Sequence, residues 1–263
     1  MITFEEATHI LSSLIPVHLA EDWDNPGPQL GLRHTSITKI LVALDLNNEV
    51  LDEAFNLGVQ LIITHHPLFF RPITHIVDYT KKETLIYKLI QNNICVYSAH
   101  TNLDVLFFKE LPQHFNVNNI LPLKKSDIDP SLGLGSYGVL PASMSLAHLV
   151  EIVQNRLSSR HLKVVGDLNK KVQTIAFCGG TGSGFINEKY KALGLDVLVT
   201  ADIKYHDAQK AQELDLALID AGHFATENIM MKELEKLLRT KIKENIYLSK
   251  IITDPFLDTK EAE

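Results

Sequence analysis

Two adjacent histidines, His65 and His66, end the apolar run of LIITHHPLFF at residues 61–70. A buried imidazole needs hydrogen-bond partners, so an adjacent pair at a strand end consists either of capped polar residues of a loop or of ligands. Other histidines and carboxylates occupy the same kind of position, after predicted strands: His100, Asp104, His223 and Glu227. Open α/β sheets form their ligand crevices at the carboxyl ends of strands, so these side chains are candidates for one site.

Histidine and carboxylate ligands without thiolates suit Zn, Fe, Mn or similar divalent ions. His223 and Glu227 are four residues apart at a predicted helix start, where they can share one face and where a carboxylate is favoured. One tetrahedral ion with an open position needs fewer than five ligands, so we expect two ions per chain. The expected ligands are His65, His66, Asp104, His223 and Glu227. We interpret other histidines as surface or satisfied residues: His18, His34, His75, His114, His148 and His161.

Strand and helix signals alternate along the chain and predict an α/β fold. A β-rich run covers 37–44, Asn47 and Gly58 bound a helix with a buried face, and 59–63 is the next strand. Thr80 has the capping-box spacing to Glu83 and begins a helix that leads into a strand at 94–98. The apolar faces of these two helices are predicted to contain Val50, Leu51, Ala54, Leu85, Ile86, Leu89 and Ile90.

The pattern weakens over residues 105–138, where proline, asparagine and glycine accumulate, and we interpret this stretch as the passage between two domains. Regular elements then resume. We expect helices near 146–157, 186–193, 207–214 and 228–240 and strands near 162–165, 172–178, 197–200, 216–219 and 246–249. The predicted first domain is 1–123 plus about 223–263, and the second is about 124–222.

Two glycine motifs could suggest nucleotide binding. Gly133, Gly135 and Gly138 have the G-x-G-x-x-G spacing but open no predicted helix, so we interpret them as a turn. The glycine-rich loop 179–184 lies between a strand and a helix but lacks the Lys-Ser/Thr of a P-loop. Tight-turn geometry and phosphate contact both remain open there.

The 263 residues carry 25 basic and 32 acidic side chains, for a net charge of −7, without a basic cluster. Nucleic acid and anionic membranes are therefore not expected partners, and a small-molecule substrate is. The start of the chain lacks a secretory pattern and no apolar run approaches about 18 residues, which predicts a cytoplasmic protein. Cys95 and Cys178 sit in apolar runs and are expected to be buried and reduced.

Several segments together resemble the Nif-three-like family, whose members are also called GTP cyclohydrolase I type 2 homologues. They are EDWDNPGPQLG (21–31), ITHHPLFF (63–70), SAHTNLD (98–104), CGGTGSGF (178–185), and VTADIKYHDA with IDAGHFATE (199–227). The resemblance implies two interlocked α/β domains with mixed sheets flanked by helices and a dinuclear metal site at the domain interface. It also implies a homohexamer of the short form, without the extra central domain of longer members.

Residue by residue, the resemblance implies that the five expected ligands hold the metals, with Glu227 bridging them and His100 orienting a ligand or facing the substrate. Pro67 favours an extended backbone at His66, so the neighbouring imidazoles would face different ions. The chain departs from the family pattern at 23–29 (WDNPGPQ) and after the HTNLD motif, which alters the expected pocket lining.

Two ions polarise a substrate oxygen and activate water, which predicts a metal-dependent hydrolase with His100 or His206 as proton carrier. A nucleotide-like substrate such as GTP, a phosphoester or another cyclic amide would suit this chemistry. The alternatives are a non-catalytic metal-handling or regulatory interaction protein and a structural metal that joins two domains.

Overall fold

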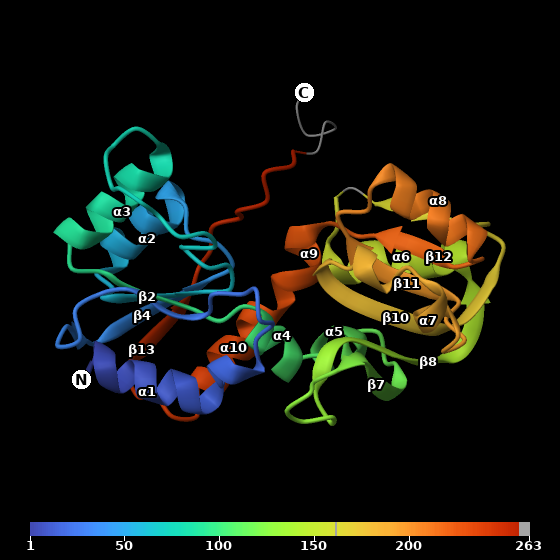
Figure 1. Ribbon diagram of the computed structural model, residues 1–263, viewed down its shortest axis with the longest axis horizontal. Coiled ribbons are helices and arrows are strands. Elements are labelled where there is room, and N and C mark those ends of the chain that lie inside the picture. The colour runs from blue at the N-terminus through green and yellow to red at the C-terminus, as the bar shows by residue number, and fades with distance from the viewer. Residues whose placement is uncertain (161, 258–263) are drawn as a thin grey trace. The chain divides into compact units, whose positions relative to one another are not determined.

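In the computed structural model, which describes residues 1–160 and 162–257, the chain forms two compact units (Figure 1). Unit 1 is Met1–Leu103 with Met231–Thr253, and unit 2 is Asp104–Met230 with the described residues from Asp254 on. These divisions fall at 103/104 and 230/231, whereas the sequence predicts 123/124 and 222/223. His161 lies outside the described residues.

Unit 1 contains a five-stranded sheet in the order β13-β4-β5-β6-β2. The strands are β13 (Asn245–Leu248), β4 (Lys39–Ala43), β5 (Leu61–Thr64), β6 (Cys95–Ser98) and β2 (Gly27–Leu30). Neighbours from β13 to β6 are parallel, and β2 pairs antiparallel with β6. A small second sheet pairs β1 (Ile2–Thr3) with β3 (Ser36–Ile37). The β-rich run predicted at 37–44 is therefore divided between β3 and β4.

Helices cover both faces of the larger sheet of unit 1. Figure 1 shows α2 (Asn48–Leu57) and α3 (Lys81–Gln91) on one face and α1 (Phe4–Leu14) on the other. The predicted caps are confirmed: Asn47 accepts from the Val50 amide, Gly58 has φ 65°, and Thr80 and Glu83 form a capping box. The predicted buried faces are also confirmed except at Ile90, which is 47% exposed because it lies on the flank of the stripe.

Unit 2 contains a six-stranded mixed sheet in the order β7-β8-β10-β11-β12-β9. The strands are β7 (Asn118–Lys125), β8 (Gly133–Ser145), β10 (Lys171–Thr181), β11 (Val197–Ala201), β12 (Ala217–Asp220) and β9 (Lys163–Val165). The helices α5 (Glu110–Gln113) and α6 (Leu146–Leu157) pack in one apolar core. The helices α7 (Glu188–Lys191) and α8 (Tyr205–Glu213) pack in a second core that contains other residues of the same sheet.

The stretch 105–138 is not a passage between domains, because β7 and β8 form an antiparallel pair there. Two of its glycines serve this pairing. A Cβ on Gly133 would lie 2.2 Å from the Lys124 carbonyl oxygen, and one on Gly138 would lie 2.5 Å from the Asn118 carbonyl oxygen. Two glycines of the G-x-G-x-x-G spacing are therefore positions in β8 where β7 approaches closely, and the prediction of a turn there is wrong.

Three other boundaries differ from the prediction. The strand predicted to end at 178 continues to Thr181, so the first glycines of the glycine-rich loop belong to β10. The helix predicted at 186–193 is reduced to α7, which follows a short 3-10 turn, Ser183–Phe185. The helix predicted at 228–240 is preceded by a separate one, so that α9 (His223–Glu227) and α10 (Ile229–Arg239) follow each other.

Each unit contains one cysteine, Cys95 in β6 and Cys178 in β10, and both are buried and free, as predicted. Burial raises the pKa of both thiols. Within the described ranges, no helix is both long and apolar enough to cross a membrane.

Candidate metal centre

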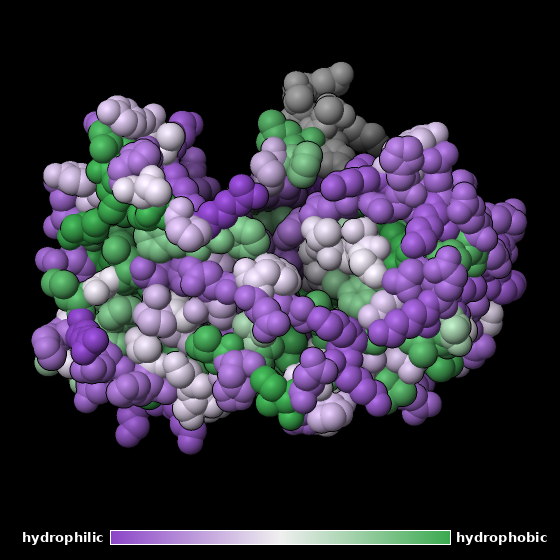
Figure 2. Space-filling view, viewed as in Figure 1, coloured by the Kyte–Doolittle hydropathy of each residue, from purple (hydrophilic) through white to green (hydrophobic). Residues whose placement is uncertain are grey.

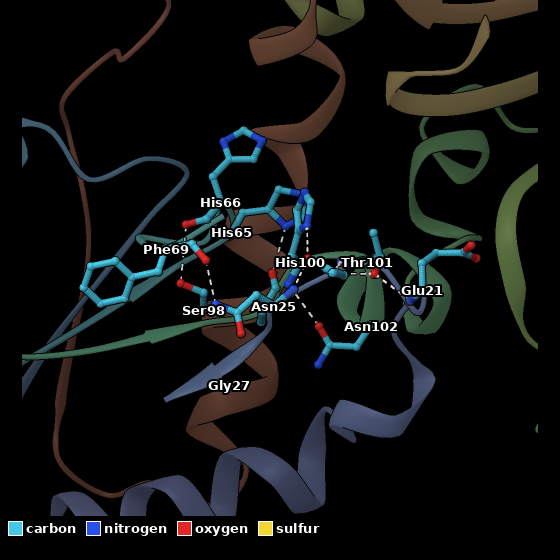
Figure 3. Close-up of polar contacts among 12 residues, drawn as sticks. Glu21, Asn25, Gly27, His65, His66, Phe69, Ser98, His100, Thr101 and Asn102 are labelled. Carbon is cyan, nitrogen blue, oxygen red and sulfur yellow. Dashed lines mark hydrogen bonds and ion pairs between the residues drawn. The ribbon is translucent and has the colours of Figure 1, made fainter. Parts of the chain in front are cut away.

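Three histidines of unit 1 lie together at the ends of neighbouring parallel strands. His65 and His66 follow β5, and His100 follows β6. The ring centroids are 5.1 Å apart for His65 and His66, 5.0 Å for His65 and His100, and 5.6 Å for His66 and His100. Each ring has a nitrogen within 4.8 Å of the corresponding nitrogens of the others (Figure 3). This spacing places the nitrogens of His65 and His66, the expected ligands, beside that of His100, the expected proton carrier.

His65 is buried, and its orientation is fixed by the backbone. Its Nδ1 lies 2.9 Å from the carbonyl oxygen of Ala99. A carbonyl oxygen can only accept, so Nδ1 carries the hydrogen and the Nε2 of the neutral ring presents a lone pair. Metal-binding histidines in proteins are held in this way.

His66 is oriented by a carboxylate rather than by a carbonyl group. Its Nδ1 lies 2.7 Å from Oδ1 of Asp45, which follows β4. The other carboxylate oxygen of Asp45 accepts a hydrogen bond of 2.5 Å from the Thr253 hydroxyl. Both oxygens of Asp45 are therefore engaged, and an ionised Asp45 directs the Nε2 lone pair of His66 away from itself.

His100 is held by Asp24, whose side chain is fully buried. The Nδ1 of His100 lies 2.7 Å from Asp24 Oδ1, while the amide and the hydroxyl of Thr101 donate to Asp24 Oδ2 at 3.0 and 2.5 Å. Burial raises the pKa of Asp24, but the hydrogen bonds from His100 and Thr101 outweigh it and lower this pKa to about 2. Asp24 is consequently ionised at neutral pH and accepts the Nδ1 hydrogen of His100.

Hydroxyl and amide side chains fix the backbone that carries these histidines. The Thr64 hydroxyl donates to the His66 carbonyl oxygen at 2.8 Å and lies 2.8 Å from the Ser98 hydroxyl. The Asn102 side chain accepts from the His100 amide at 2.9 Å (Figure 3). The two strand ends are thus joined by hydrogen bonds, which limits movement of the imidazoles.

An exposed aromatic pair borders the histidines of unit 1. Trp23 and Phe70 have ring centroids 5.9 Å apart. Their centroids are 6.0 and 6.3 Å from that of His100, both in edge-on geometry. The prolines by which the chain departs from the family pattern, Pro26 and Pro28, follow Trp23 in the same segment.

In unit 2, the short helix α9 presents His223 and Glu227 on one face, as the four-residue spacing predicts. The Nε2 of His223 is 3.0 Å from Glu227 Oε2, and its Nδ1 is 2.7 Å from Asp202 Oδ2. The hydrogen bond to Glu227 is the main reason why the pKa of His223 is raised to about 9 in the metal-free chain. Burial raises the pKa of Asp202, but hydrogen bonds from Thr181 and His223 outweigh it and lower that pKa.

The glycine-rich segment packs against this pair. The Gly180 amide donates to the Thr226 hydroxyl at 3.0 Å, and Gly180 has φ +58°. A Cβ on Gly180 would lie 2.2 Å from Glu227 Oε1 and 3.1 Å from His223 Nε2. Of the two roles that the sequence leaves open, this geometry supports tight backbone packing beneath a carboxylate.

Asp104 and His206 are the other predicted site residues of unit 2. Asp104, in α4 (Thr101–Leu106), lines a small cavity with Cys178 and Gly179. Burial, then the charges of Asp104 and Glu227, raise the pKa of the Cys178 thiol, so both carboxylates lie near it. His206 is exposed on α8 with its Nδ1 3.0 Å from Gln209 Oε1, and the surface over α8 is mainly hydrophilic (Figure 2). Its role as a proton carrier stays a prediction.

Sequence reasoning did not reveal that three carboxylates, Asp24, Asp45 and Asp202, orient the histidines. Asp45 follows β4 with one residue between, and Asp202 directly follows β11. Both satisfy the same strand-end rule that identifies the histidines. Asp24 had a signal in the WDN motif, but only the structure shows that its carboxylate contacts His100.

The fold and the site define a two-unit α/β protein with histidine and carboxylate groups suited to divalent cations. A family model described as Duf34/NIF3 (NGG1p interacting factor 3) matches residues 2–255. The chain therefore belongs to this family, which confirms the resemblance inferred from its motifs.

Individual relatives extend over almost the whole chain. A GTP cyclohydrolase 1 type 2 homolog of Clostridium perfringens is 34% identical over 253 residues, covering 94% of this chain and 96% of the relative. A protein of the same description from Clostridium acetobutylicum is 36% identical, with 96% and 97% covered. The crystal structure of a Bacillus cereus protein related to NIF3 superposes with a TM-score of 0.90 at 26% identity, covering 97% and 99% of the two chains.

Proposed function

We propose that the chain binds two divalent ions and is a metal-dependent hydrolase of a nucleotide-like or other small substrate. The proposed ligands are His65, His66, Asp104, His223 and Glu227. One observation carries the proposal: the Nδ1 atoms of the histidines are held by oxygen acceptors, which leaves Nε2 as the ligand atom in His65 and His66, and in His223 once its proton is displaced from Glu227. The description of the relatives as GTP cyclohydrolase 1 type 2 homologs supports a hydrolytic reaction.

The donor set fits borderline divalent cations. Imidazole nitrogens and carboxylate oxygens suit Zn, Fe and Mn, and both thiols are buried with raised pKa values, which disfavours thiolate ligation. Glu227 offers two carboxylate oxygens and lies beside His223, so it is suited to bridge two ions. A ligand sphere of this composition leaves coordination positions for water and substrate.

Bound divalent ions would supply Lewis acidity that polarises the substrate and activates water. The residues of the chain would orient the reactants and move protons. Asp24 holds the Nδ1 hydrogen of His100, so the opposite nitrogen of His100 can take up a proton and release it. His206 is the second candidate for this role, on the exposed first turn of α8.

The first test is the metal content per chain, by elemental analysis, of the wild type and of Glu227→Ala. His148→Ala is the control, because His148 is exposed on α6 outside the candidate site. We expect about two ions per wild-type and control chain and a marked loss in Glu227→Ala. Hydrolysis is then measured with the loaded chain on a panel of nucleotides and phosphoesters.

Two results would contradict the proposal. A wild-type chain that binds no metal even after addition of Zn, Mn or Fe(II) would remove the basis for hydrolysis. Stable metal binding without turnover on the panel, but with ion transfer to an acceptor, would favour a metal-handling or regulatory interaction protein instead. Assembly as a cytoplasmic homohexamer stays a prediction, which light scattering would test through a mass of six chains.

A further inference from the structure

A cavity of about 440 Å³ lies beside His66 in unit 1. One side is the segment 45–49, which leads from the end of β4 into the first turn of α2. The other side is formed by Pro67 and Leu68, which follow His66, and by the start of α3. Small-molecule sites in proteins have volumes in this range, so the cavity can admit a small substrate next to a candidate metal ligand.

The start of α3 supplies the positive charges of the cavity, from Lys81 and Lys82. Both side chains are exposed, and neither forms an ion pair with another described residue. Of the two carboxylates in the lining, Asp45 is engaged by His66 and Thr253. Glu49 is exposed in the first turn of α2. The lysines are therefore available to an anion, with Asp45 and Glu49 as the opposing charges.

The N-termini of two helices add to the positive electrostatic potential of the cavity. They would not define a site without the cavity and the lysines. Both α2, with 10 residues, and α3, with 11, begin at the cavity. The amides of a first helical turn favour an anion nearby. Leu46, Leu68 and Leu85 provide an apolar wall for the uncharged part of a ligand.

We propose that this cavity binds a phosphate group of the substrate, so that the substrate of the chain is a small phosphorylated molecule. The inference deepens the proposed function and rests on it, because the ligand would reach His66 from the cavity. A phosphate group carries nearly two negative charges and three acceptor oxygens, so it suits two ammonium groups better than a carboxylate ligand, which carries one charge. Lys81 and Lys82 would bind the phosphate and fix the orientation of the rest of the molecule.

The test is calorimetric titration of the full metal-loaded chain with inorganic phosphate, with sodium acetate as the comparison anion. We expect the double variant Lys81→Ala/Lys82→Ala to bind phosphate at least about tenfold more weakly than the wild type. Lys88→Ala is the matched control on the same helix, since Lys88 does not line the cavity, and it should bind as the wild type does. Glu49→Gln should bind phosphate about twofold to fivefold more tightly, and acetate should bind more weakly throughout.

The metal content of each variant is measured in parallel, which separates this inference from the proposed hydrolase. Wild-type metal content with no phosphate binding, or with equal phosphate affinity in the double variant, would overturn the phosphate site alone. Lysine-dependent phosphate binding by a chain that takes up no metal would support the cavity and contradict the hydrolase. Acetate binding as tight as phosphate binding, with the same dependence on the lysines, would contradict a phosphorylated substrate.

Discussion

Asp45 connects His66 to Thr253: its Oδ1 lies 2.7 Å from His66 Nδ1 and its Oδ2 accepts from the Thr253 hydroxyl at 2.5 Å. Thr253 is 187 positions along the chain from His66, beyond the last strand, β13. The orientation of a candidate metal ligand thus depends on a residue near the end of the described chain.

Asp45→Asn is expected to weaken metal binding about tenfold to a hundredfold, because the amide no longer holds His66 as a carboxylate does. Thr253→Val should have a smaller effect in the same direction. Asp52→Asn, an exposed position on α2, is the control. Titration of the chelated chain with Zn against a competing dye measures the affinity, and equal affinities of wild type and Asp45→Asn would contradict an orienting role.

Gly180→Ala is expected to destabilise unit 2 by about 2 kcal/mol or more and to lower metal content. The new Cβ would collide with Glu227 Oε1 at 2.2 Å, at a residue with positive φ. Gly184→Ala is the matched control, since a Cβ there meets no atom within 4 Å. Thermal unfolding and elemental analysis would be compared for the two variants, and a Gly180→Ala chain as stable and as metal-rich as Gly184→Ala would refute the packing role.

Asp24 should make stability depend on acid pH. Its pKa is lowered from 3.8 to about 2, so its contribution is fully present above pH 4 and is lost as pH falls through 2. At neutral pH we expect Asp24→Asn to lower the free energy of unfolding by about 2 kcal/mol. Urea unfolding at pH 7 and near pH 2 would measure it, and the difference between wild type and variant should shrink at the lower pH.

The contribution of His223 to the stability of the metal-free chain should have the opposite pH dependence. Its pKa is raised from 6.5 to about 9, so its contribution is present below pH 6.5 and is lost as pH rises through 9. Solvent screening of a partly exposed imidazole limits this contribution to on the order of 1 kcal/mol.

Metal binding through His223 must displace its proton, since a metal ligand is a neutral imidazole. Calorimetric titration of the chelated chain with Zn at pH 7, in buffers of different ionisation enthalpy, should therefore show release of about one proton, and Glu227→Gln should reduce this release. Proton release that is unchanged in that variant would show that the proton comes from another group.

The sequence predicts those elements whose ends carry local signals. The bounds of α6 are predicted at both ends, and α2 and α3 are predicted by their caps, because these interactions lie within a few residues of each other. The pair β7 and β8 is missed because its glycines are required by contacts between strands, which no local pattern reveals. The break between α9 and α10 is missed for a related reason, since α9 packs against β10.

The candidate site is likewise predicted only in part. Strand ends identify His65, His66, His100 and His223 from the sequence, because each follows a clear apolar run. Their carboxylate partners come from other strands and loops: Asp24 is 76 positions from His100, and Asp202 is 21 from His223. Such pairings depend on tertiary structure, so the sequence contains these carboxylates but does not indicate which histidine each of them orients.

The placement of one buried cysteine in each unit makes the thiols natural reporters of unfolding. Alkylating reagents attack the thiolate, and burial keeps Cys95 and Cys178 protonated and covered while their units are folded. The labelling rate of Cys95 would then follow the opening of unit 1, and that of Cys178 the opening of unit 2. Mass spectrometry of a single labelled sample can therefore compare the kinetic stability of the two halves without any engineered probe.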